Sequence, residues 1–412
     1  MPLHYQGHVE PGFEPVAALF ARFFKAPERG GGSLVVRIGE RMLVDLWGGF
    51  ADPRQKRPWQ RDSLGLSFST SKGVAATIIH RLADQGLLSY DEPVAAYWSQ
   101  FAAGGKGKIT VRELMSHRAG LDDLAPIAPN IGALLDYTSA EQRLADAVPK
   151  QRIGTPAYHA ITFGWLMAGL ARAITGRGMQ DLLQTEICEP LGIDGLSFGM
   201  PTTGADRVPE LVGSLGRLAA LGPAGVALLP RWIPGRRALH SVWVPGIETV
   251  FRGPEPPALD TVMPAANGMF TAESLATLYG ALAGGGAIGG RRLVSADTAR
   301  QLRRVQTRAP DRNLVIPMLW RLGYHQAFIP GVRLARAFGH YGYAGSGAWG
   351  DPETGMSAAF VTNRVSPATA PLGDLQIMRL SRAVVLCARR VGAIGRDVQI
   401  TPPADTGVPD AA

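Results

Sequence analysis

A serine and a lysine three positions apart, Ser69 and Lys72, open a stretch of residues with helical spacing. Residues three apart on a helix share a face, so the lysine amine can reach the serine hydroxyl. Burial and the positive end of a helix dipole both disfavour a charged lysine, and an uncharged amine can accept a proton. The N–H groups of a helix N-terminus can also stabilise the negative charge that develops in acyl transfer. The pair therefore suits a serine nucleophile with its own base.

The same pattern has an ordinary structural interpretation, because S-x-x-K occurs by chance and a serine before a helix is most often its N-cap. A rival serine, Ser197, stands in a G-x-S-x-G pattern that is typical of the nucleophile turn of α/β-hydrolases. That turn needs a helix directly after it, and residues 200–204, MPTTG, cannot begin an orderly one. We therefore expect Ser69, and not Ser197, to be the nucleophile.

The elements that would position Ser69 follow from the apolar spacing. Three apolar residues on one helical face, followed by a glycine, are Val74, Ile78, Leu82 and Gly86. Residues 69–86 are therefore predicted to form a buried helix. Upstream, two apolar runs within residues 34–49 flank the pair Gly39-Glu40 and predict a β-hairpin.

Later segments continue the alternation of sheet and helix. Apolar spacing and end signals predict helices over 108–121, 161–176 and 269–283 and a buried strand over 355–363. The stretch 202–263 is rich in Pro, Gly and bulky apolar residues, Trp243 among them, and has no clear period. A loop of this length in a compact protein is usually functional or mobile.

The order of sheet, helices and sheet predicts an α+β fold (an α/β sandwich). Its antiparallel sheet would be built from both chain ends and flanked by helices, with a mostly helical domain inserted. We place the discontinuous domain at 1–85 and 264–400, and the inserted domain with its long apolar loop region at 86–263. The tail 401–412 is predicted to be disordered. Periodicity alone also permits two unrelated consecutive domains.

The sequence around Ser69 resembles a known superfamily. The stretch 67–101, SFSTSKGVAATIIHRLADQGLLSYDEPVAAYWSQF, is followed by ITVRELMSHRAGL at 109–121. Together they resemble the serine β-lactamase and penicillin-binding-protein superfamily, in particular the class C β-lactamase branch and its family VIII carboxylesterases. The resemblance extends over about residues 15–395, although 202–262 matches nothing diagnostic, and it implies a β-lactamase/transpeptidase-like fold.

Two further motifs carry the resemblance. Tyr158, in PAYHAITFGW before an apolar helix, is implied to form a general-base pair with Lys72, where a cationic neighbour would favour its phenolate. His340-Tyr341-Gly342 matches the segment of a strand that lines the active site. The backbone N–H of Tyr343 would then join that of Ser69 in an oxyanion hole, and His340 would orient polar groups.

Further residues near these motifs are candidates for lining the site by the same resemblance. They are His159, Ala265, Ala266, Asn267 and Trp243. His117, in the segment 109–121, is interpreted as a structural brace. Each of these side chains has a purely structural interpretation when taken alone.

Departures from the family pattern indicate the substrate class. Class C β-lactamases carry Tyr-x-Asn and Lys-Thr-Gly, whereas this chain has Tyr158-His159-Ala160 and His340-Tyr341-Gly342. Leaving a buried carboxylate without its cation costs about 2–5 kcal/mol, a penalty that uncharged esters avoid. We therefore expect a serine carboxylesterase or lipase-like hydrolase acting through a Ser69 acyl-enzyme. A β-lactamase, a D-amino-acid peptidase or acyltransferase, and a non-catalytic penicillin-binding-like protein remain alternatives.

Composition excludes several other classes. The net charge of +8 comes mainly from scattered arginines, so no nucleic-acid partner is expected, and the two cysteines, Cys188 and Cys387, are expected to be buried thiols. No metal or nucleotide motif occurs, so no metal and no cofactor are expected. The first 13 residues lack a signal-peptide pattern, and the apolar run 218–230 is too short to span a bilayer. We expect a cytoplasmic enzyme for a small-molecule ester. The sequence leaves open both the oligomeric state and whether the region 211–246 makes peripheral membrane contact.

Overall fold

The structure is a computed structural model that describes residues 5–213, 236–251, 253, 256–365, 375–395 and 398–400. The tail predicted to be disordered, 401–412, lies outside the described residues, as does most of the apolar stretch 211–246. Among the described residues, no helix is both long and apolar enough to cross a membrane.

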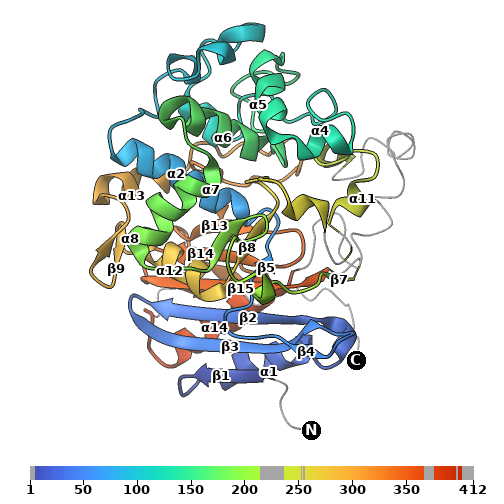
Figure 1. Cartoon of the computed structure of the whole chain (residues 1–412). Coiled ribbons are helices and arrows are strands. Elements are labelled where there is room, and N and C mark those ends of the chain that lie inside the picture. Colours follow the sequence, from blue (N-terminus) through green and yellow to red (C-terminus); the bar gives the residue numbers. More distant parts are fainter. Residues whose placement is uncertain are drawn as a thin grey trace.

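An antiparallel sheet forms the base of the molecule (Figure 1). Its strands run in the order β1 (Tyr5–Val9), β3 (Arg41–Asp52), β2 (Gly31–Ile38), β15 (Met356–Thr362), β14 (Gly347–Asp351), β13 (Phe338–Tyr341) and β11 (His325–Gln326), and β4 (Arg57–Pro58) also pairs with β3. The junction between β2 and β15 joins the two ends of the chain, with Val35 opposite Ala359. This sheet confirms the predicted α+β fold.

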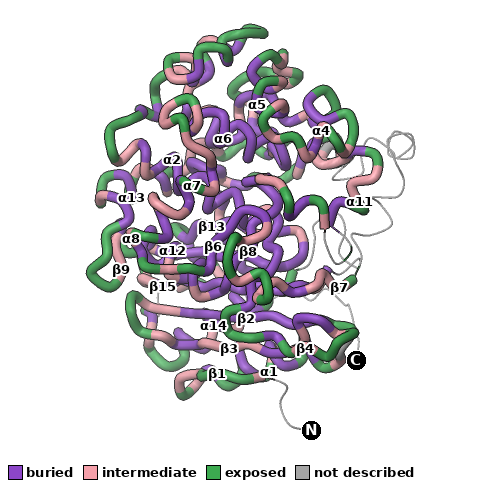
Figure 2. Tube along the Cα trace, viewed as in Figure 1, coloured by how far each residue is buried: buried purple, intermediate pink, exposed green. Residues whose placement is uncertain are grey.

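Helices cover both faces of the sheet (Figure 1). Helices α1 (Glu14–Phe23) and α14 (Gln376–Arg390) pack together on one face, and α12 (Ala272–Ala283) packs on the other. Alternate residues of β2 serve the two cores, because Leu34 belongs to the cluster under α1 and Val35 to the cluster under α12. Buried residues fill these interfaces and the middle of the helical layer (Figure 2).

A mostly helical layer stands above α12 (Figure 1). Its α-helices are α2 (Ser71–Asp84), α3 (Val111–Met115), α4 (Ile131–Leu135), α5 (Tyr137–Asp146), α6 (Thr162–Thr175), α7 (Met179–Leu183) and α8 (Glu189–Leu191), and a π-helical turn, Gln184–Cys188, joins the last two. Smaller elements are α10 (Arg236–His240), α11 (Ile247–Val250), α13 (Ala296–Leu302), and the 3-10 turns Pro27–Arg29, Val94–Ala96, Ser99–Gly105, Ala205–Arg207 and Pro257–Leu259.

Short strands tie the helical layer to the rest of the chain. A three-stranded sheet has the order β5 (Gly65–Leu66), β8 (Gly268–Phe270) and β6 (Leu196–Phe198), and β7 (Val212–Gly213) pairs with β16 (Arg364–Val365). The remaining pairs are β9 (Ala287–Ile288) with β10 (Arg291–Arg292) and β12 (Val332–Arg333) with β17 (Gln399–Ile400). Because β6 and β7 pair with strands beyond residue 263, the domain boundaries stay a prediction.

Several predicted elements are confirmed. The hairpin at 34–49 is β2 and β3, turning at Gly39, which has a φ of 55°. The strand at 355–363 is β15, and the helix at 161–176 is α6, which ends at Gly176 in the left-handed conformation. Both cysteines are free and buried as expected, and burial raises the pKa of Cys188 to about 12.

Three predicted helices are shorter than expected. The helix at 69–86 is α2, which begins at Ser71, so Ser69 lies in the turn before it. The helix predicted over 108–121 is wrong after α3, which ends at Met115. His117 has a φ of 59°, a value that a right-handed helix cannot contain. Its start is a capping box of Thr110 and Glu113. In the helix at 269–283, the first residues belong to strand β8 instead.

Asn363, directly after β15, ties both chain ends together. Its side-chain oxygen accepts the N–H of Gly31 at 2.8 Å. Its amide nitrogen donates to the carbonyls of Phe50 at 3.2 Å, Ala51 at 3.1 Å and Glu210 at 2.7 Å. The residue is 1% exposed, so water cannot replace these bonds.

The Asn363→Ala variant is expected to lose about 1–3 kcal/mol of unfolding free energy, because several buried polar groups lose their partner. Urea unfolding followed by circular dichroism measures this loss. Gln55→Ala, at an exposed position, is the control and should stay within about 0.5 kcal/mol. Equal stability of the two variants would show that the Asn363 bonds do not hold the sheet ends together.

Candidate active site

Ser69 lies in the turn between β5 and α2. The preceding Phe68 has a φ of 43°, a left-handed conformation that a side-chain-bearing residue seldom adopts. Its ring packs 5.4 Å from that of Phe251, from the long irregular stretch. Every residue from 63 to 80 is buried except Ser69, which is partly exposed. The turn therefore presents this single hydroxyl from an otherwise closed segment.

Three side chains meet at the Ser69 hydroxyl. The Lys72 Nζ donates to Ser69 Oγ at 3.1 Å, and the Tyr158 hydroxyl donates to the same oxygen at 2.9 Å. The Lys72 Nζ also donates to the carbonyl of Ala265 at 2.9 Å and lies 5.1 Å from the centre of the Tyr158 ring. The structure thus brings together the three residues that the sequence singled out for catalysis.

Burial governs the charge of Lys72. The side chain is fully buried, and in the part of the chain that the structure describes no carboxylate pairs with it. Desolvation therefore holds the pKa of the amine well below its ordinary value. The favoured form is the neutral amine, which has a lone pair free to take a proton.

Burial acts on Tyr158 in the opposite sense. It raises the pKa of the phenol well above its ordinary value, the charge of Asp311 raises it further, and the hydrogen bond to Ser69 lowers it. The pKa of Tyr158 thus moves in the direction opposite to the one expected from a cationic neighbour, because desolvation of the phenol is the largest cause. A neutral amine and a neutral phenol therefore flank the serine.

Aromatic rings hold Tyr158 from two sides. The Trp320 ring lies nearly parallel to the phenol, with centroids 5.6 Å apart and an interplanar angle of 11°. The His117 ring meets it edge-on at 5.1 Å. His117 is fully buried, and its strained backbone places the ring against both Tyr158 and Trp320, 4.2 Å from the latter. The predicted bracing role of His117 agrees with these contacts.

The segment His340-Tyr341-Gly342 ends strand β13 beside the Ser69 turn. A Cβ added at Gly342 would lie 2.3 Å from the carbonyl oxygen of Ser67, so only glycine fits this approach. The Thr70 hydroxyl also donates to the carbonyl of Ser346 at 3.3 Å, and the Tyr343 ring lies 6.4 Å from that of Phe68.

His340 lies close to the same cluster, with its ring 6.3 Å from that of Tyr158. Its Nδ1 donates to the carbonyl of Tyr341 at 3.2 Å, and its buried Nε2 has no partner among the described residues. Burial is the largest cause that holds its pKa well below the ordinary value. The ring is therefore neutral, with one unpaired acceptor.

Tyr341 and His159 serve the scaffold. The Tyr341 hydroxyl donates to the carbonyl of Phe328 at 3.4 Å, and its ring packs against the core on the α14 side of the sheet. The His159 Nδ1 donates to the carbonyl of Ala157 at 2.6 Å, and its Nε2 accepts the N–H of Leu121 at 3.0 Å. Both ring nitrogens of His159 are therefore occupied.

Asn267 also acts on backbone. Its amide nitrogen donates to the carbonyls of Ala258 at 2.8 Å and Thr261 at 2.7 Å, and its oxygen accepts the N–H of Met263 at 3.0 Å. This side chain shapes the loop that carries the Ala265 carbonyl to Lys72. Ala266 is buried in the main core.

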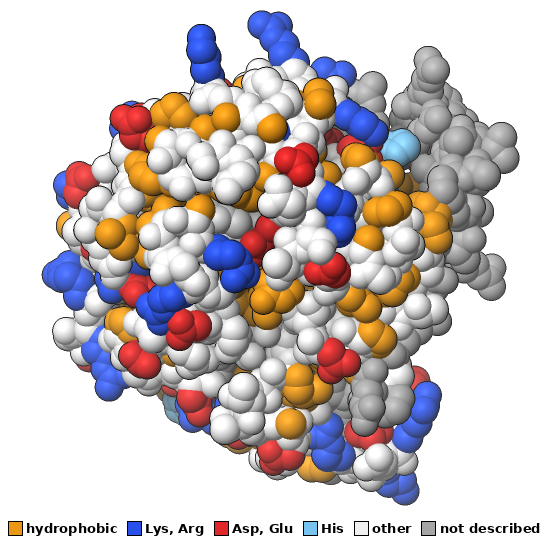
Figure 3. Space-filling view, turned by 45° about the horizontal axis from the view of Figure 1, so that its top comes forward, with side chains coloured by type: hydrophobic (Ala, Val, Ile, Leu, Met, Phe, Trp, Pro, Cys, Tyr) orange, Lys and Arg blue, Asp and Glu red, His pale blue; other side chains and the backbone are white. Residues whose placement is uncertain are grey.

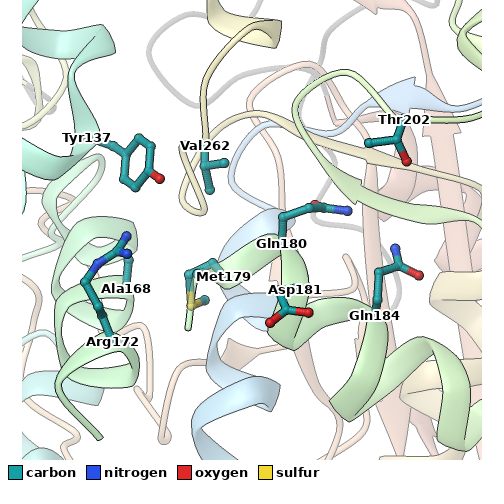
Figure 4. Close-up of a pocket in the computed structure, with 10 residues that line it drawn as sticks. Tyr137, Ala168, Arg172, Met179, Gln180, Asp181, Gln184, Thr202 and Val262 are labelled. Atoms are coloured by element: carbon teal, nitrogen blue, oxygen red, sulfur yellow. The ribbon is translucent and has the colours of Figure 1, made fainter. Parts of the chain in front are cut away.

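Two cavities lie away from the Ser69 hydroxyl. Trp243 lines one of about 300 Å³ together with Pro129 and Leu239. The other, of about 400 Å³, lies beside α6 and α7 and is lined by side chains that include Tyr137, Arg172 and Gln180 (Figure 4). Among the residues that line either cavity are none of the three that meet at the Ser69 hydroxyl.

Charges in this second cavity are already neutralised. Arg172 pairs with Glu141 at 2.9 Å, and Asp181 pairs with Arg177. On the face drawn in Figure 3, basic and acidic side chains of the described residues are interspersed. Within the described residues, no group of three or more His, Cys, Asp and Glu side chains is arranged to hold a metal ion.

The rival serine is poorly placed for catalysis. Ser197 lies inside strand β6 and is 4% exposed, and its hydroxyl has no partner in the described part of the chain. The next helical element is the 3-10 turn at Ala205–Arg207, so no helix follows Ser197 directly. This confirms the expectation that residues 200–204 do not begin a helix, which argued against a nucleophile turn at Ser197.

Sequence reasoning did not find Trp320, Asp311 or the part that Phe251 plays beside Phe68. All three lie in irregular segments without periodicity, where neither spacing nor a motif marks a residue. The carbonyl of Ala265 was a near-site candidate only, because the sequence does not reveal which backbone groups face a lysine.

Fold and site together define a serine hydrolase class on the β-lactamase/transpeptidase-like fold. Residues 16–382 match the family model described as Beta-lactamase, and the chain belongs to this family. It is 44% identical over 393 residues to "Esterase/beta-lactamase LipL" of Mycobacterium tuberculosis, which covers 94% of this chain and 90% of the relative.

Solved structures agree with this assignment. A penicillin-binding protein homolog from Caulobacter crescentus has a TM-score of 0.77 and 34% identity, covering 93% of this chain and 99% of that one. A family VIII carboxylesterase has a TM-score of 0.76 and 31% identity over the same shares. The chain is an esterase/beta-lactamase-like hydrolase on the serine hydrolase fold.

The Gly342→Ala variant tests the close approach beside the nucleophile. The added methyl group pushes the segment after β13 against the Ser67 carbonyl, two residues before Ser69, and we expect fluorophosphonate labelling of Ser69 to slow on the order of 10²-fold. Gly178→Ala is the control, because its Cβ would meet nothing within 4 Å. Mass spectrometry of the labelled peptide gives both rates, and equal rates would contradict the steric argument.

Proposed function

We propose that this protein hydrolyses uncharged carboxylic esters through an acyl-enzyme on Ser69, with Lys72 and Tyr158 as its general-base pair. The observation that carries the proposal is the convergence of a buried amine and a buried phenol on one serine oxygen, at 3.1 Å and 2.9 Å. Such a hydroxyl can lose its proton as it attacks a carbonyl carbon.

In the acylation step, Ser69 Oγ forms a bond to the ester carbonyl carbon and passes its proton to the neutral Lys72 amine. The tetrahedral intermediate then collapses, and the bond to the alcohol oxygen breaks. The Tyr158 phenol donates its proton to the departing oxygen and regains one from the Lys72 ammonium. The products are a neutral alcohol and the acyl-enzyme, with both bases returned to their resting forms.

Deacylation reverses these roles. Water gives a proton to the Lys72–Tyr158 pair and attacks the acyl carbon, and the bond to Ser69 Oγ breaks as that oxygen regains its proton. A carboxylic acid leaves. One acyl-enzyme thus links two half-reactions that use the same pair of groups.

We place the oxyanion hole at the backbone N–H groups of Ser69 and Tyr343. Within the described residues, the Ser69 N–H has no acceptor, and it lies in the turn that precedes α2, whose dipole favours negative charge. Tyr343 directly follows Gly342, the residue in closest approach to the turn. Two such donors, aimed at the developing oxyanion, are the usual requirement for acyl transfer.

The neutrality of the site favours an uncharged ester over a β-lactam carboxylate. In place of the Lys-Thr-Gly cation stands His340, which burial keeps neutral, and the Asn of Tyr-x-Asn is replaced by Ala160. The relative that is 44% identical is named an esterase/beta-lactamase, and a similar structure is titled a family VIII carboxylesterase. Both names support an ester as the substrate. The same relative's name keeps β-lactam hydrolysis as the second candidate.

We assign the acyl chain a place beside Phe251 and Phe68. These rings lie 5.4 Å apart next to the Ser69 turn, and Phe251 belongs to the apolar stretch 202–262. An apolar wall beside the nucleophile suits a hydrophobic acyl group. His340 contributes an unpaired acceptor on the Tyr158 side of the site.

A short-chain p-nitrophenyl ester assay beside a chromogenic cephalosporin assay tests this function. We expect ester turnover to exceed cephalosporin turnover and to fall by several orders of magnitude in Ser69→Ala. Ser197→Ala is the matched control and should keep its activity. Faster turnover of the cephalosporin favours the second candidate, and loss of activity in Ser197→Ala alone overturns the choice of nucleophile.

The pH profile of kcat/KM tests the assigned proton carriers. Only the neutral amine accepts a proton, so activity should rise with pH through the lowered pKa of Lys72, well below the value near 10.4 of an ordinary lysine. The phenol must stay protonated, so its raised pKa places the alkaline limb above the ordinary tyrosine value near 10.

The Tyr158→Phe variant separates the two carriers in this profile. It should lower kcat about 10²–10⁴-fold while the acidic limb persists, since that limb belongs to Lys72. An acidic limb that disappears in Tyr158→Phe would reassign the base.

A further inference from the structure

A buried carboxylate lies behind Tyr158, and the catalytic roles above leave it unused. Asp311 is 1% exposed and lies in the irregular segment between α13 and β11. Its oxygens accept four N–H groups, and no arginine or lysine of the described residues pairs with it. A buried charge costs free energy unless hydrogen bonds compensate it, so these four N–H groups are what stabilises the carboxylate here.

Two of these four bonds lead to Tyr158. Asp311 Oδ1 accepts the backbone N–H of Tyr158 at 3.2 Å. Asp311 Oδ2 accepts the indole N–H of Trp320 at 2.8 Å, and this indole stacks on the Tyr158 phenol at 5.6 Å. One carboxylate therefore fixes both the backbone of Tyr158 and the ring that lies against its side chain.

The neighbouring Asn313 completes the hold on Tyr158. Its amide donates to the carbonyl of Tyr158 at 3.0 Å and to the carboxylate of Asp122 at 2.9 Å. The N–H of Arg312 donates to the carbonyl of Pro156 at 2.9 Å. The segment 311–313 thus binds the stretch 156–158 at three points, which include both the N–H and the carbonyl of Tyr158.

Backbone strain marks the same loop. Asp311 also accepts the N–H groups of Asn313 at 2.9 Å and Leu314 at 3.0 Å, which closes a tight turn. Between Asp311 and Trp320, Val315 has a φ of 59° and Leu319 a φ of 50°. A β-branched residue rarely adopts this conformation, and such strain persists where the surrounding contacts over-determine it. The loop is therefore held in one shape.

We propose that Asp311 is a positioning residue, which holds Tyr158 and Trp320 so that the phenol stays within hydrogen-bond distance of Ser69. The proposal rests on the function assigned to Tyr158 above. Asp311 touches neither Ser69 nor Lys72 among the contacts described, so it acts through Tyr158. Its negative charge also raises the pKa of the phenol, which keeps the proton on Tyr158 in the resting site.

The Asp311→Asn variant tests this role, because an amide cannot accept N–H groups on both sides. One face of the amide would meet an N–H donor with its own NH₂ group. We expect kcat for a p-nitrophenyl ester to fall on the order of 10²-fold with little change in KM, since a displaced catalytic group costs rate more than binding. The alkaline limb should move to lower pH, because removing the negative charge lowers the pKa of Tyr158.

A double-mutant cycle with Tyr158→Phe separates positioning from a general effect on the fold. If Asp311 acts through the phenol, Asp311→Asn should change kcat little once the hydroxyl is gone. An equal loss in both backgrounds, or no loss in either, overturns the proposal. Asp351→Asn is the matched control. Asp351, the last residue of β14, is another buried aspartate, and it accepts the backbone N–H of Thr354 in the turn between β14 and β15.

Trp320→Phe supplies a second variant if Asp311→Asn does not fold. It keeps an aromatic ring at this position and removes the indole N–H that Asp311 holds, together with part of the indole ring system. A loss of kcat that vanishes in the Tyr158→Phe background supports the proposal, and an unchanged kcat overturns it.

The labelling rate of Ser69 by a fluorophosphonate reads the same geometry without an ester. If the wild-type protein does not cleave esters, the proposed function fails while this rate still tests Asp311. Slower labelling in Asp311→Asn than in Asp351→Asn supports positioning, and equal rates overturn it. The two failures are therefore distinguishable.

Discussion

The site depends on keeping the Lys72 amine out of water without giving it a counter-charge. An ammonium in this position would lack a carboxylate partner in the described part of the chain, so burial disfavours it and leaves a base. The packed sheet, α2 and the helical layer are what exclude water from this amine. The Ala265 carbonyl then orients the Lys72 amine. Ser69, whose hydroxyl the amine contacts, is the only residue between 63 and 80 that is partly exposed.

A neutral shell extends the same constraint outward. Burial, as the largest cause, holds the pKa of His117, His325 and His340 below the ordinary value, and it raises the pKa of Tyr158. Aromatic rings fill the space between these groups, and they add contact area without charge. A site built in this way discriminates by shape and polarity, and a charged substituent on a substrate would enter it without a partner.

Much of this arrangement was predictable from the sequence. The i, i+3 spacing brings Ser69 and Lys72 together locally, across the turn that opens α2, and Tyr158 stands before an apolar helix in a motif of fixed order. The position of Asp311, 153 residues from Tyr158, follows from loop packing that no period encodes. Motif membership also does not specify which way a side chain points: on β13, His340 lies beside Tyr158, whereas Tyr341 packs on the opposite core.

The pairing of β2 with β15 has a consequence in time. Gly31 is bound to Asn363, 332 residues later, so the central sheet cannot close until residue 363 has left the ribosome. The turn that carries Ser69 belongs to an early part of the chain, yet the strand that flanks it, β13, is made late. A nascent chain therefore contains its nucleophile long before it contains a site, and contacts of such long range also slow the search for the native pairing.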